Sequence, residues 1–391
     1  MAYTVAIIGT GADPDQRDRD GYAMAYRHAP GYQRLDKCNL AACADIVPEN
    51  ASAFAENFDL ETVYTDHKTL LRKESLDIVS VCVPPDTHTE IVVDCAEIGS
   101  LEAIHCEKPM ATTWGDCQKM VEVCDQQDVQ LTIDHQRRFA TPVTKARRLL
   151  EEGKIGDLRR LEFSEANLFD AGTHLFDLCS YLTEDATPEW VLAGVDPDPE
   201  NRWFGALNGT QAVAQWGYDD GTQGFASTAE ADRPTVVDAY LRIVGEDGTI
   251  EIQPDDGPPL RMRTDGGWKT IDTGGESVYR PGLSTFEAAR NKLANAVPGF
   301  SAEVSVGPSH YEQAIEHLVS ALDEEFEPRI SGRRALAGTE LVFASWASAH
   351  RGERVELPLD IEHNPLEAIC AEKFESEQSP PTSVTAETQE S

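Results

Sequence analysis

The sequence contains few basic residues, with 33 Lys and Arg against 69 Asp and Glu and a net charge of −36. An acidic surface of this size repels phosphate backbones and anionic lipid headgroups, so we exclude nucleic acid and membrane surfaces as partners. Salt screens the self-repulsion of such a surface within a few ångströms at molar concentration. We therefore predict a halophilic protein that works in a salt-rich cytosol.

Long apolar runs and paired cysteines are also absent from the sequence. No stretch approaches 18 consecutive apolar residues, and the N-terminal MAYTVAIIGTG lacks a basic segment and a cleavage site, which predicts a soluble, cytoplasmic protein. The nine cysteines are odd in number and form no Cys-x-x-Cys pair, which favours neither a disulfide framework nor a zinc site. We expect reduced thiols and no metal.

The chain of 391 residues is long enough for two domains with separate cores. In residues 1–136, short apolar runs alternate with stretches whose apolar residues have helical spacing. The runs cover residues 4–8, 40–43, 78–83, 103–106 and 130–133. Strands that are apolar throughout and alternate with helices are typical of a parallel sheet covered on both faces. The fold class is therefore predicted to be α/β, with an N-terminal Rossmann doubly wound parallel sheet.

Residues 137–360 have a different pattern, in which one helix over 143–153 precedes several short strand-like runs. These runs cover residues 161–163, 210–218, 224–229, 239–244 and 249–253. The turn sequences at 219–222 and 245–248 favour hairpins, so we expect an α+β domain with a mostly antiparallel open sheet. Its closing helices are predicted at residues 286–296, 310–322 and 334–350.

Two further expectations concern the second domain and the end of the chain. An open apolar sheet face needs covering, which predicts a homodimer or homotetramer. Residues 361–391 are acidic and rich in Ser, Thr, Pro and Glu, so we predict a disordered tail that buries too little surface to fold.

A glycine-rich turn follows the first apolar run. Gly9-Thr10-Gly11 allows a tight turn and close backbone approach to a pyrophosphate, although a turn without any ligand stays open as the alternative. A polar insertion at residues 12–20 separates this turn from the next helix. Counted from the end of the insertion, Asp45 lies near the separation expected of a ribose ligand, and no Arg beside it would neutralise a 2′-phosphate. This favours NAD over NADP.

Two more segments carry chemically useful side chains. Glu107-Lys108-Pro109 directly follows the apolar run at residues 103–106, at the sheet edge where such folds bind ligands. Further on, Asp170-Ala171-Gly172-Thr173-His174-Leu175-Phe176-Asp177 places Asp177 and His174 on one helical face. Taken singly, the first segment could be a surface turn with an ion pair, and the second could hold a structural histidine.

The order and spacing of these pieces resemble the glucose-fructose oxidoreductase, inositol dehydrogenase and MocA (Gfo/Idh/MocA) family over residues 3–360. The resemblance rests on the Gly-x-Gly turn, Glu-Lys-Pro and Asp-x-Gly-x-His-x-x-Asp, and extends to Arg137-Arg138-Phe139. Cys82-Val83-Pro84-Pro85-Asp86-Thr87-His88 looks like the family's cofactor-contacting loop.

The resemblance implies roles for individual residues. Lys108 would hydrogen-bond the substrate hydroxyl and the nicotinamide ribose, His174 would be the general base, and Asp170 would hold substrate hydroxyls. The expected cofactor-binding residues are Gly9, Thr10, Gly11, Asp45, Pro84, His88, Glu107 and Lys108. Arg138 is a candidate to bind a substrate carboxylate or hydroxyl. His88, Arg137 and Arg138 could equally serve as caps or ion-pair partners.

Elementary chemistry agrees with these roles, because oxidation of a secondary alcohol needs a base for the hydroxyl proton and a positive charge near the developing alkoxide. We therefore predict an oxidoreductase that moves a hydride between a CH–OH group of a sugar or polyol and NAD, with NADP possible. Two alternatives stay open: an NAD-dependent enzyme of the same fold that cleaves glycosidic bonds, and a non-catalytic sensor of dinucleotide or sugar.

Overall fold

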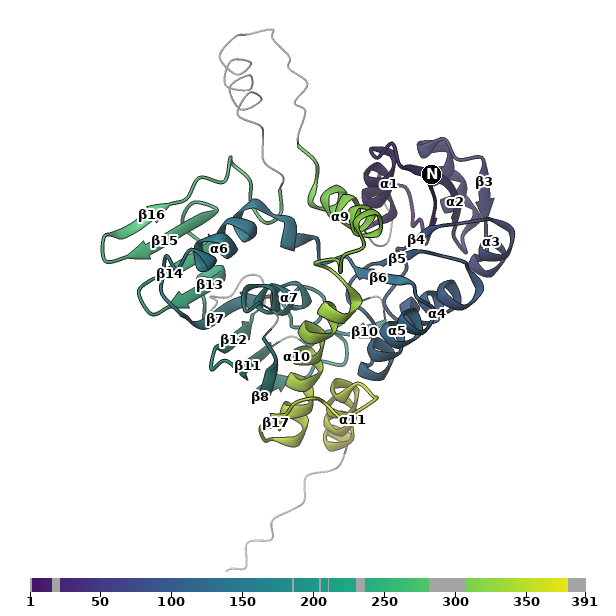
Figure 1. Ribbon diagram of the computed structural model, residues 1–391. Helices are drawn as coiled ribbons and strands as arrows, with labels where there is room; N and C mark the ends of the chain where they lie inside the picture. Colours follow the sequence, from purple (N-terminus) through teal and green to yellow (C-terminus); the bar gives the residue numbers. More distant parts are fainter. Residues whose placement is uncertain are drawn as a thin grey trace, which may run out of the picture.

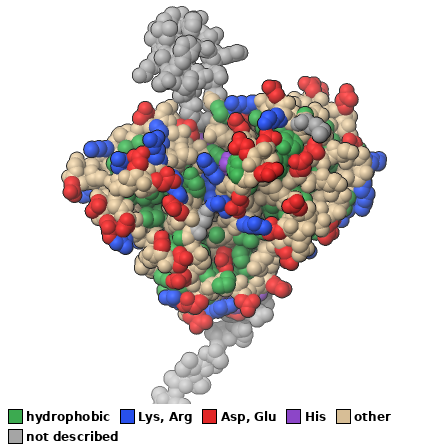
Figure 2. Space-filling view, in the orientation of Figure 1, with side chains coloured by type: hydrophobic (Ala, Val, Ile, Leu, Met, Phe, Trp, Pro, Cys, Tyr) green, Lys and Arg blue, Asp and Glu red, His purple; other side chains and the backbone are tan. Residues whose placement is uncertain are grey.

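The computed structural model describes residues 2–15, 22–184, 186–203, 205–209, 211–229, 236–280 and 307–378. Within these ranges the chain forms two large sheets that lie side by side, with helix α10 (Gly332–Arg351) running between them (Figure 1). Acidic side chains are spread over the face of the molecule seen in Figure 2, as the composition implies.

The first sheet has six strands in the order β3-β2-β1-β4-β5-β6, all parallel. The strands are β1 (Tyr3–Ile8), β2 (Cys38–Ala44), β3 (Thr62–Tyr64), β4 (Ile78–Val81), β5 (Ala103–Cys106) and β6 (Gln130–Ile133). The connecting helices are α1 (Ala25–Gln33), α2 (Pro48–Phe58), α3 (His67–Lys73), α4 (His88–Ile98) and α5 (Trp114–Gln126). This is the doubly wound arrangement predicted from the sequence.

The central strands are buried on both faces, which explains why they are mostly apolar. Every residue of β4 and β5 is buried, including the polar Ser80 and His105. Because parallel strands all end at one edge, the loops after β1, β2, β4 and β5 converge there. The candidate residues of those four loops are brought together by this topology.

The second sheet has nine strands in the order β16-β15-β14-β13-β7-β12-β11-β8-β17. The strands are β7 (Leu158–Glu165), β8 (Pro188–Asp196), β11 (Gln211–Tyr218), β12 (Gln223–Thr228), β13 (Ala239–Gly245), β14 (Thr249–Pro254), β15 (Leu260–Thr264), β16 (Gly267–Thr270) and β17 (Val355–Glu356). Strands β9 (Arg202–Trp203) and β10 (Ala206–Leu207) pair separately. The helical elements are η1 (Gln136–Phe139), α6 (Thr141–Glu151), α7 (Gly172–Leu182), α9 (His310–Glu324), α10 and α11 (Pro365–Gln378).

The mostly antiparallel character predicted for this sheet is confirmed, as are both hairpins, β11 with β12 and β13 with β14. One strand pairing differs from a simple succession of hairpins. Strand β7 lies between β12 and β13, parallel to the first and antiparallel to the second. The strand of this sheet that comes first in the sequence, β7, therefore lies at the centre of the sheet.

Helix α9 belongs to the later part of the chain but packs on the first sheet (Figure 1). Its Ile315 and Leu318 join a core with Val5 and Ile7 of β1. At Gly31 of α1, an added Cβ would lie 2.7 Å from Ile315 Cδ1, so the two helices touch through this glycine. The domain boundary after residue 136 stays a prediction. Helix α9 lies beyond this boundary in the sequence but packs on the first sheet.

The end of the chain corrects the prediction of a disordered tail from residue 361. Residues Pro365–Gln378 form helix α11, which packs on α10, with Leu366 and Cys370 buried. Residues 379–391 and the helix predicted at 286–296 lie outside the described residues. Among the described residues, no helix combines the length and the apolar character that a bilayer-crossing segment requires.

The face of the second sheet turned away from α7 and α10 is only partly apolar. Leu192 and Val213 are exposed there. Across the neighbouring strands runs a series of ion pairs that joins Glu162, Arg242, Glu251 and Arg261. The face is therefore partly charged and not apolar as expected. The homodimer or homotetramer stays a prediction.

Candidate active site

A cavity of about 960 Å³ lies at the carboxyl edge of the first sheet and extends to the beginning of α7. The loops after β1, β2, β4 and β5 line one side of it, and the segment from Asp170 to His174 lines the other. Of the predicted site residues, the cavity brings together Gly9, Gly11, Asp45, Pro84, Glu107, Lys108, Asp170 and His174.

The glycine turn after β1 has the backbone shape that the sequence implies. Gly9 has a φ of +85°, and an added Cβ would lie 2.5 Å from Val83 Cγ1 and 2.9 Å from the backbone carbon of Cys82. Asp45 holds this turn from the next strand, since its Oδ2 accepts hydrogen bonds from Gly11 N (2.9 Å) and Thr10 Oγ1 (3.1 Å). The turn is thus fixed against both neighbouring strands.

Replacing Gly9 with alanine is expected to weaken NAD binding at least tenfold, because the new Cβ would displace the turn from Val83 and would strain a left-handed backbone. The measurement is calorimetric titration with NAD. Gly221→Ala is the matched control, since Gly221 also has a positive φ (+86°) but has no atoms near its missing Cβ. Equal NAD affinity in both variants would remove the turn from the binding site.

Lys108 and Asp170 form an ion pair in the cavity. Lys108 Nζ donates to Asp170 Oδ1 at 2.7 Å and to the carbonyl oxygen of the same residue at 2.9 Å. The chain reaches this position through a close turn at Gly172, where an added Cβ would lie 2.6 Å from the carbonyl oxygen of Asn167. The first and second halves of the chain are therefore joined by a charged contact inside the cavity.

His174 faces the same cavity from the first turn of α7. It is 2 % exposed, and its Nδ1 has no hydrogen-bond partner among the described residues. Burial, together with the positive charges of Arg137 and Lys108, holds the pKa of His174 well below its usual 6.5. The imidazole is therefore neutral near pH 7 and able to accept a proton.

Arg138 corrects a sequence prediction, because it does not reach the cavity. Its guanidinium is fully buried and binds both carboxylate oxygens of Asp177, each at 2.7 Å. His135 lies on the same carboxylate, with Nδ1 2.8 Å from Asp177 Oδ1. Asp177 is consequently committed to Arg138 and His135, and the motif's second acidic residue does not orient His174.

His88 and Thr10 also take places different from those predicted. His88 is fully buried and does not line the cavity; its Nε2 lies 2.8 Å from the carbonyl oxygen of Val83 and its Nδ1 2.9 Å from that of Pro109. It ties together the loops that follow β4 and β5. Thr10 is likewise fully buried, with its hydroxyl on Asp45. Both support the cavity wall from behind.

Two cavity residues had no specific role assigned to them from the sequence: Arg137, which was a candidate alongside Arg138, and Tyr311, which was not considered. Arg137 lines the cavity, with its guanidinium 4.8 Å from the ring centre of Tyr279, and Tyr311 of α9 also lines it. The adjacent pair Arg137-Arg138 indicated that an arginine lies near the site, but the sequence could not show which of the two faces the cavity. Tyr311 lies in a helix whose packing on the first sheet had no local signal.

Comparison with known proteins gives two matches to family models that together span most of the chain. Residues 4–135 match the Gfo/Idh/MocA model described as an oxidoreductase family, NAD-binding Rossmann fold, and residues 162–357 match the one described as its C-terminal alpha/beta domain. The chain is 26 % identical over 353 residues to a D-apiose dehydrogenase of Paraburkholderia graminis, which covers 84 % of this chain and 86 % of that protein.

Solved structures give the same fold at lower identity. An oxidoreductase from Agrobacterium radiobacter, in complex with NAD+, L-tartaric acid and magnesium, has a TM-score of 0.69 at 19 % identity and covers 94 % of this chain and 100 % of its own. The aldose-aldose oxidoreductase from Caulobacter crescentus, complexed with glycerol, has a TM-score of 0.69 at 20 % identity and covers 91 % and 100 %.

Proposed function

Because this chain belongs to the Gfo/Idh/MocA family of NAD-binding oxidoreductases, we propose that it transfers a hydride between a CH–OH carbon of a sugar or polyol and NAD. The observation that carries the proposal is the meeting in one cavity of the Lys108–Asp170 ion pair and a neutral His174, whose Nδ1 has no hydrogen-bond partner among the described residues. The similarity to a D-apiose dehydrogenase supports a sugar-like substrate.

The residues of the first sheet fit a bound NAD. A turn that only glycine can make at Gly9 leaves room for a pyrophosphate, and the carboxylate of Asp45 faces the cavity, where it would accept hydrogen bonds from the hydroxyls of a ribose. The same carboxylate would repel a 2′-phosphate, which favours NAD over NADP. When bound, the nicotinamide ring supplies a hydride acceptor.

The chain's own residues would then handle the proton and the charge. Neutral His174 accepts the proton of the substrate hydroxyl, while the ammonium group of Lys108 stabilises the negative charge that develops on that oxygen. Asp170 holds Lys108 in place through two contacts and offers a carboxylate to neighbouring substrate hydroxyls. In the reverse direction His174 returns the proton.

Two measurements, each made at low salt and in molar KCl, test the proposal. The first is a binding titration of the protein with NAD and with NADP. The second follows the absorbance of the reduced cofactor while aldoses, polyols and inositols are supplied as substrates. We expect reduction with at least one compound, a preference for NAD and higher activity in KCl. Sugar release from a glycoside without net reduced cofactor would instead identify a glycosidic-bond-cleaving enzyme. Cofactor binding without any turnover would identify a sensor.

The pH dependence of kcat/KM provides a second test. The base must be deprotonated to act, and the pKa of His174 is lowered. The decline of kcat/KM on the acid side should therefore have its midpoint at a pH below 6.5. Arg137→Met removes one of the positive charges that lower this pKa, so the acid limb should move upward, toward pH 6.5. Arg354→Met, at the surface, is the control. An acid limb unchanged by Arg137→Met would mean that another group is the base.

A further inference from the structure

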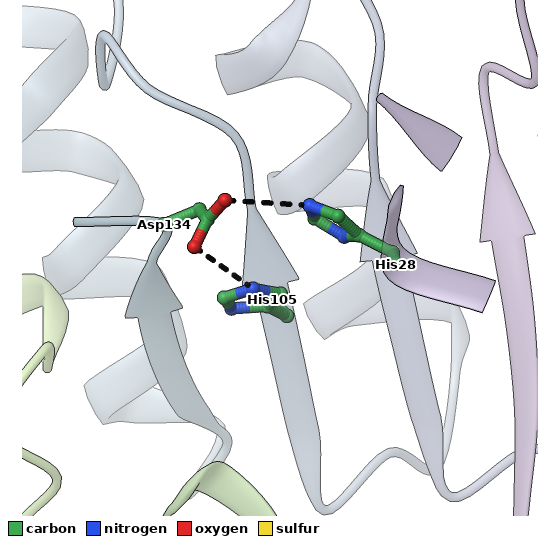
Figure 3. Close-up of side chains that lie close together, drawn as sticks. All are labelled: His28, His105 and Asp134. Carbon is green, nitrogen blue, oxygen red and sulfur yellow. Dashed lines mark ion pairs between the residues drawn. The ribbon is translucent and has the colours of Figure 1, made fainter. Parts of the chain in front are cut away.

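A cluster of ionisable side chains lies beneath the cavity and takes no part in the function proposed above. His28 of α1, His105 of β5 and Asp134, which follows β6, are all fully buried. Figure 3 shows the carboxylate of Asp134 between the two imidazoles, with Oδ2 3.5 Å from His28 Nε2 and Oδ1 3.7 Å from His105 Nε2. Three different elements thus direct polar atoms to one point in the interior.

The hydrogen bonds around His105 determine which of its nitrogens carries the proton. The hydroxyl of Thr132 donates to the carbonyl oxygen of Ile104, so its oxygen accepts the proton of His105 Nδ1 at 2.9 Å. In a neutral imidazole this leaves the lone pair on Nε2, which faces the Asp134 carboxylate. His105 Nε2 and both Asp134 oxygens have no hydrogen-bond partner among the described residues. Three acceptors therefore face one another without a donor.

His28 is arranged in a similar way. Its Nδ1 lies 3.2 Å from Ser80 Oγ, which can accept its proton, and its Nε2 is turned toward two carboxylates. Glu107 Oε1 lies 3.1 Å from this nitrogen, and Asp134 Oδ2 lies 3.5 Å from it. With a metal bound, Nδ1 would donate its proton to Ser80 Oγ, and Nε2 would lose the proton that it otherwise donates to Glu107 Oε1.

We propose that His28, His105 and Asp134 bind one divalent transition-metal cation of the Zn²⁺ type, with Glu107, whose Oε1 lies 3.1 Å from His28 Nε2, as the nearest further carboxylate. Zn–N and Zn–O bonds of about 2.0–2.2 Å in a tetrahedron separate ligand atoms by about 3.3 Å. The two histidines lie 3.5 and 3.7 Å from the oxygens of Asp134, and one ligand atom from each of the three residues lies within 4.8 Å of the other two, so small side-chain movements would bring them onto one cation. Two imidazole nitrogens select such a cation over Mg²⁺ or Ca²⁺. Its double charge balances the two buried carboxylates.

The hydroxyls of Thr132 and Ser80 strengthen this assignment. A metal-bound histidine commonly donates its other ring nitrogen to an oxygen, which fixes the ring and its tautomer. Both histidines have such an oxygen on the side away from the cluster. The site would be closed and structural, and it would join α1, β5 and β6 under the loop that carries Lys108.

The competing occupant of the cluster is a proton. An imidazolium at His28 could bridge Glu107 Oε1 and Asp134 Oδ2, which lie 3.1 and 3.5 Å from its Nε2. His105 Nε2 then faces Asp134 Oδ1 at 3.7 Å with no proton between them unless Asp134 is protonated as well. One bound cation satisfies these inward-facing atoms together, whereas protons would have to occupy both His28 and Asp134 to do so.

The test is the metal content of the full chain, expressed without a histidine tag in medium supplemented with Zn²⁺ or, separately, Co²⁺. We expect about one equivalent of metal per chain by mass spectrometry, since a buried site fills on folding. The Co²⁺ protein should show the strong visible absorption of four-coordinate cobalt. Less than about 0.1 equivalent in both preparations, after removal of loosely bound metal with a mild chelator, would overturn the proposal.

Two variants assign the ligands. His105→Leu and Asp134→Asn should each lose at least about nine-tenths of the bound metal. His310→Gln is the matched control, because His310 is also buried and lies 2.9 Å from a single carboxylate, Glu276. Metal retained in both ligand variants would overturn the assignment. If neither variant folds, the metal content and the cobalt absorption spectrum of the unaltered protein decide whether the site exists. None of these readouts requires turnover, so they are independent of the proposed function.

Discussion

Replacement of His174 with glutamine is expected to lower kcat/KM by about two to four orders of magnitude, the usual contribution of a positioned general base. Glutamine keeps much of the volume and polarity of the imidazole but cannot accept the hydroxyl proton. NAD affinity should change little, because the residues expected to bind NAD, the glycine turn and Asp45, come from the first sheet and not from α7. The measurements are initial rates with the best substrate and calorimetric NAD titration.

His350→Gln is the control for this variant, since His350 is paired with Glu372 on α11, away from the cavity, and should keep full activity. A His174→Gln enzyme with kcat/KM within about threefold of the unaltered protein would remove His174 from the chemistry. Loss of NAD binding together with turnover would assign it to the cofactor site instead. In either case Lys108 would have to act with a different base.

Replacement of Arg138 with methionine is expected to reduce the free energy of unfolding by about 3–5 kcal/mol, because it leaves the fully buried carboxylate of Asp177 without its main counter-charge. The measurement is urea denaturation followed by circular dichroism. The sequence-based reading of Arg138 as a substrate ligand predicts instead a raised KM and an unchanged stability. The two readings thus differ in both measurements.

Arg333→Met is the matched control, since Arg333 pairs with Asp125 at the surface and such pairs contribute at most about 1 kcal/mol. The double variant Arg138→Met with Asp177→Asn should recover part of the lost stability, because the unpaired buried charge is removed. An Arg138→Met protein as stable as the control, with a raised KM, would restore the substrate-binding interpretation.

The adjacent residues Arg137 and Arg138 explain why the sequence located the motif correctly but assigned substrate binding to the wrong arginine. Arg137 and Arg138 lie in the short 3-10 helix η1, in which each residue is rotated by about 120° from the one before. One guanidinium therefore turns into the cavity and the next turns toward α7. The choice depends on where α7 places Asp177, which is a tertiary contact between segments far apart in the chain.

Most of the first sheet was predictable because its signal is local: five of its six strands contain an apolar run of their own. The exception is β3, which has three residues, none of them buried, and was not predicted. Strand β7 shows the limit of this reasoning. Its sequence predicts a strand, but its place between β12 and β13 depends on pairing partners more than 50 residues away. Nothing within β7 specifies those neighbours.

The remaining misses had weaker or no local signals. Helix α11 has Leu366, Ile369 and Cys370 at helical spacing, a short apolar face that the acidic composition around it obscured. The cluster of His28, His105 and Asp134 draws one residue from each of three elements. Nothing in the local sequence of α1, of β5 or of the residues after β6 indicates that these three side chains meet.

The packing of α9 on α1 has a consequence for how the protein is made. Strands β1 to β6 are complete once Ile133 has been synthesised, but the helix that covers one face of their sheet begins only at His310. At 5–20 residues per second, the ribosome needs about 9–35 s to produce the intervening segment. During that time the apolar surface around Val5, Ile7 and Gly31 awaits its cover, and the nascent chain is exposed to aggregation until α9 emerges.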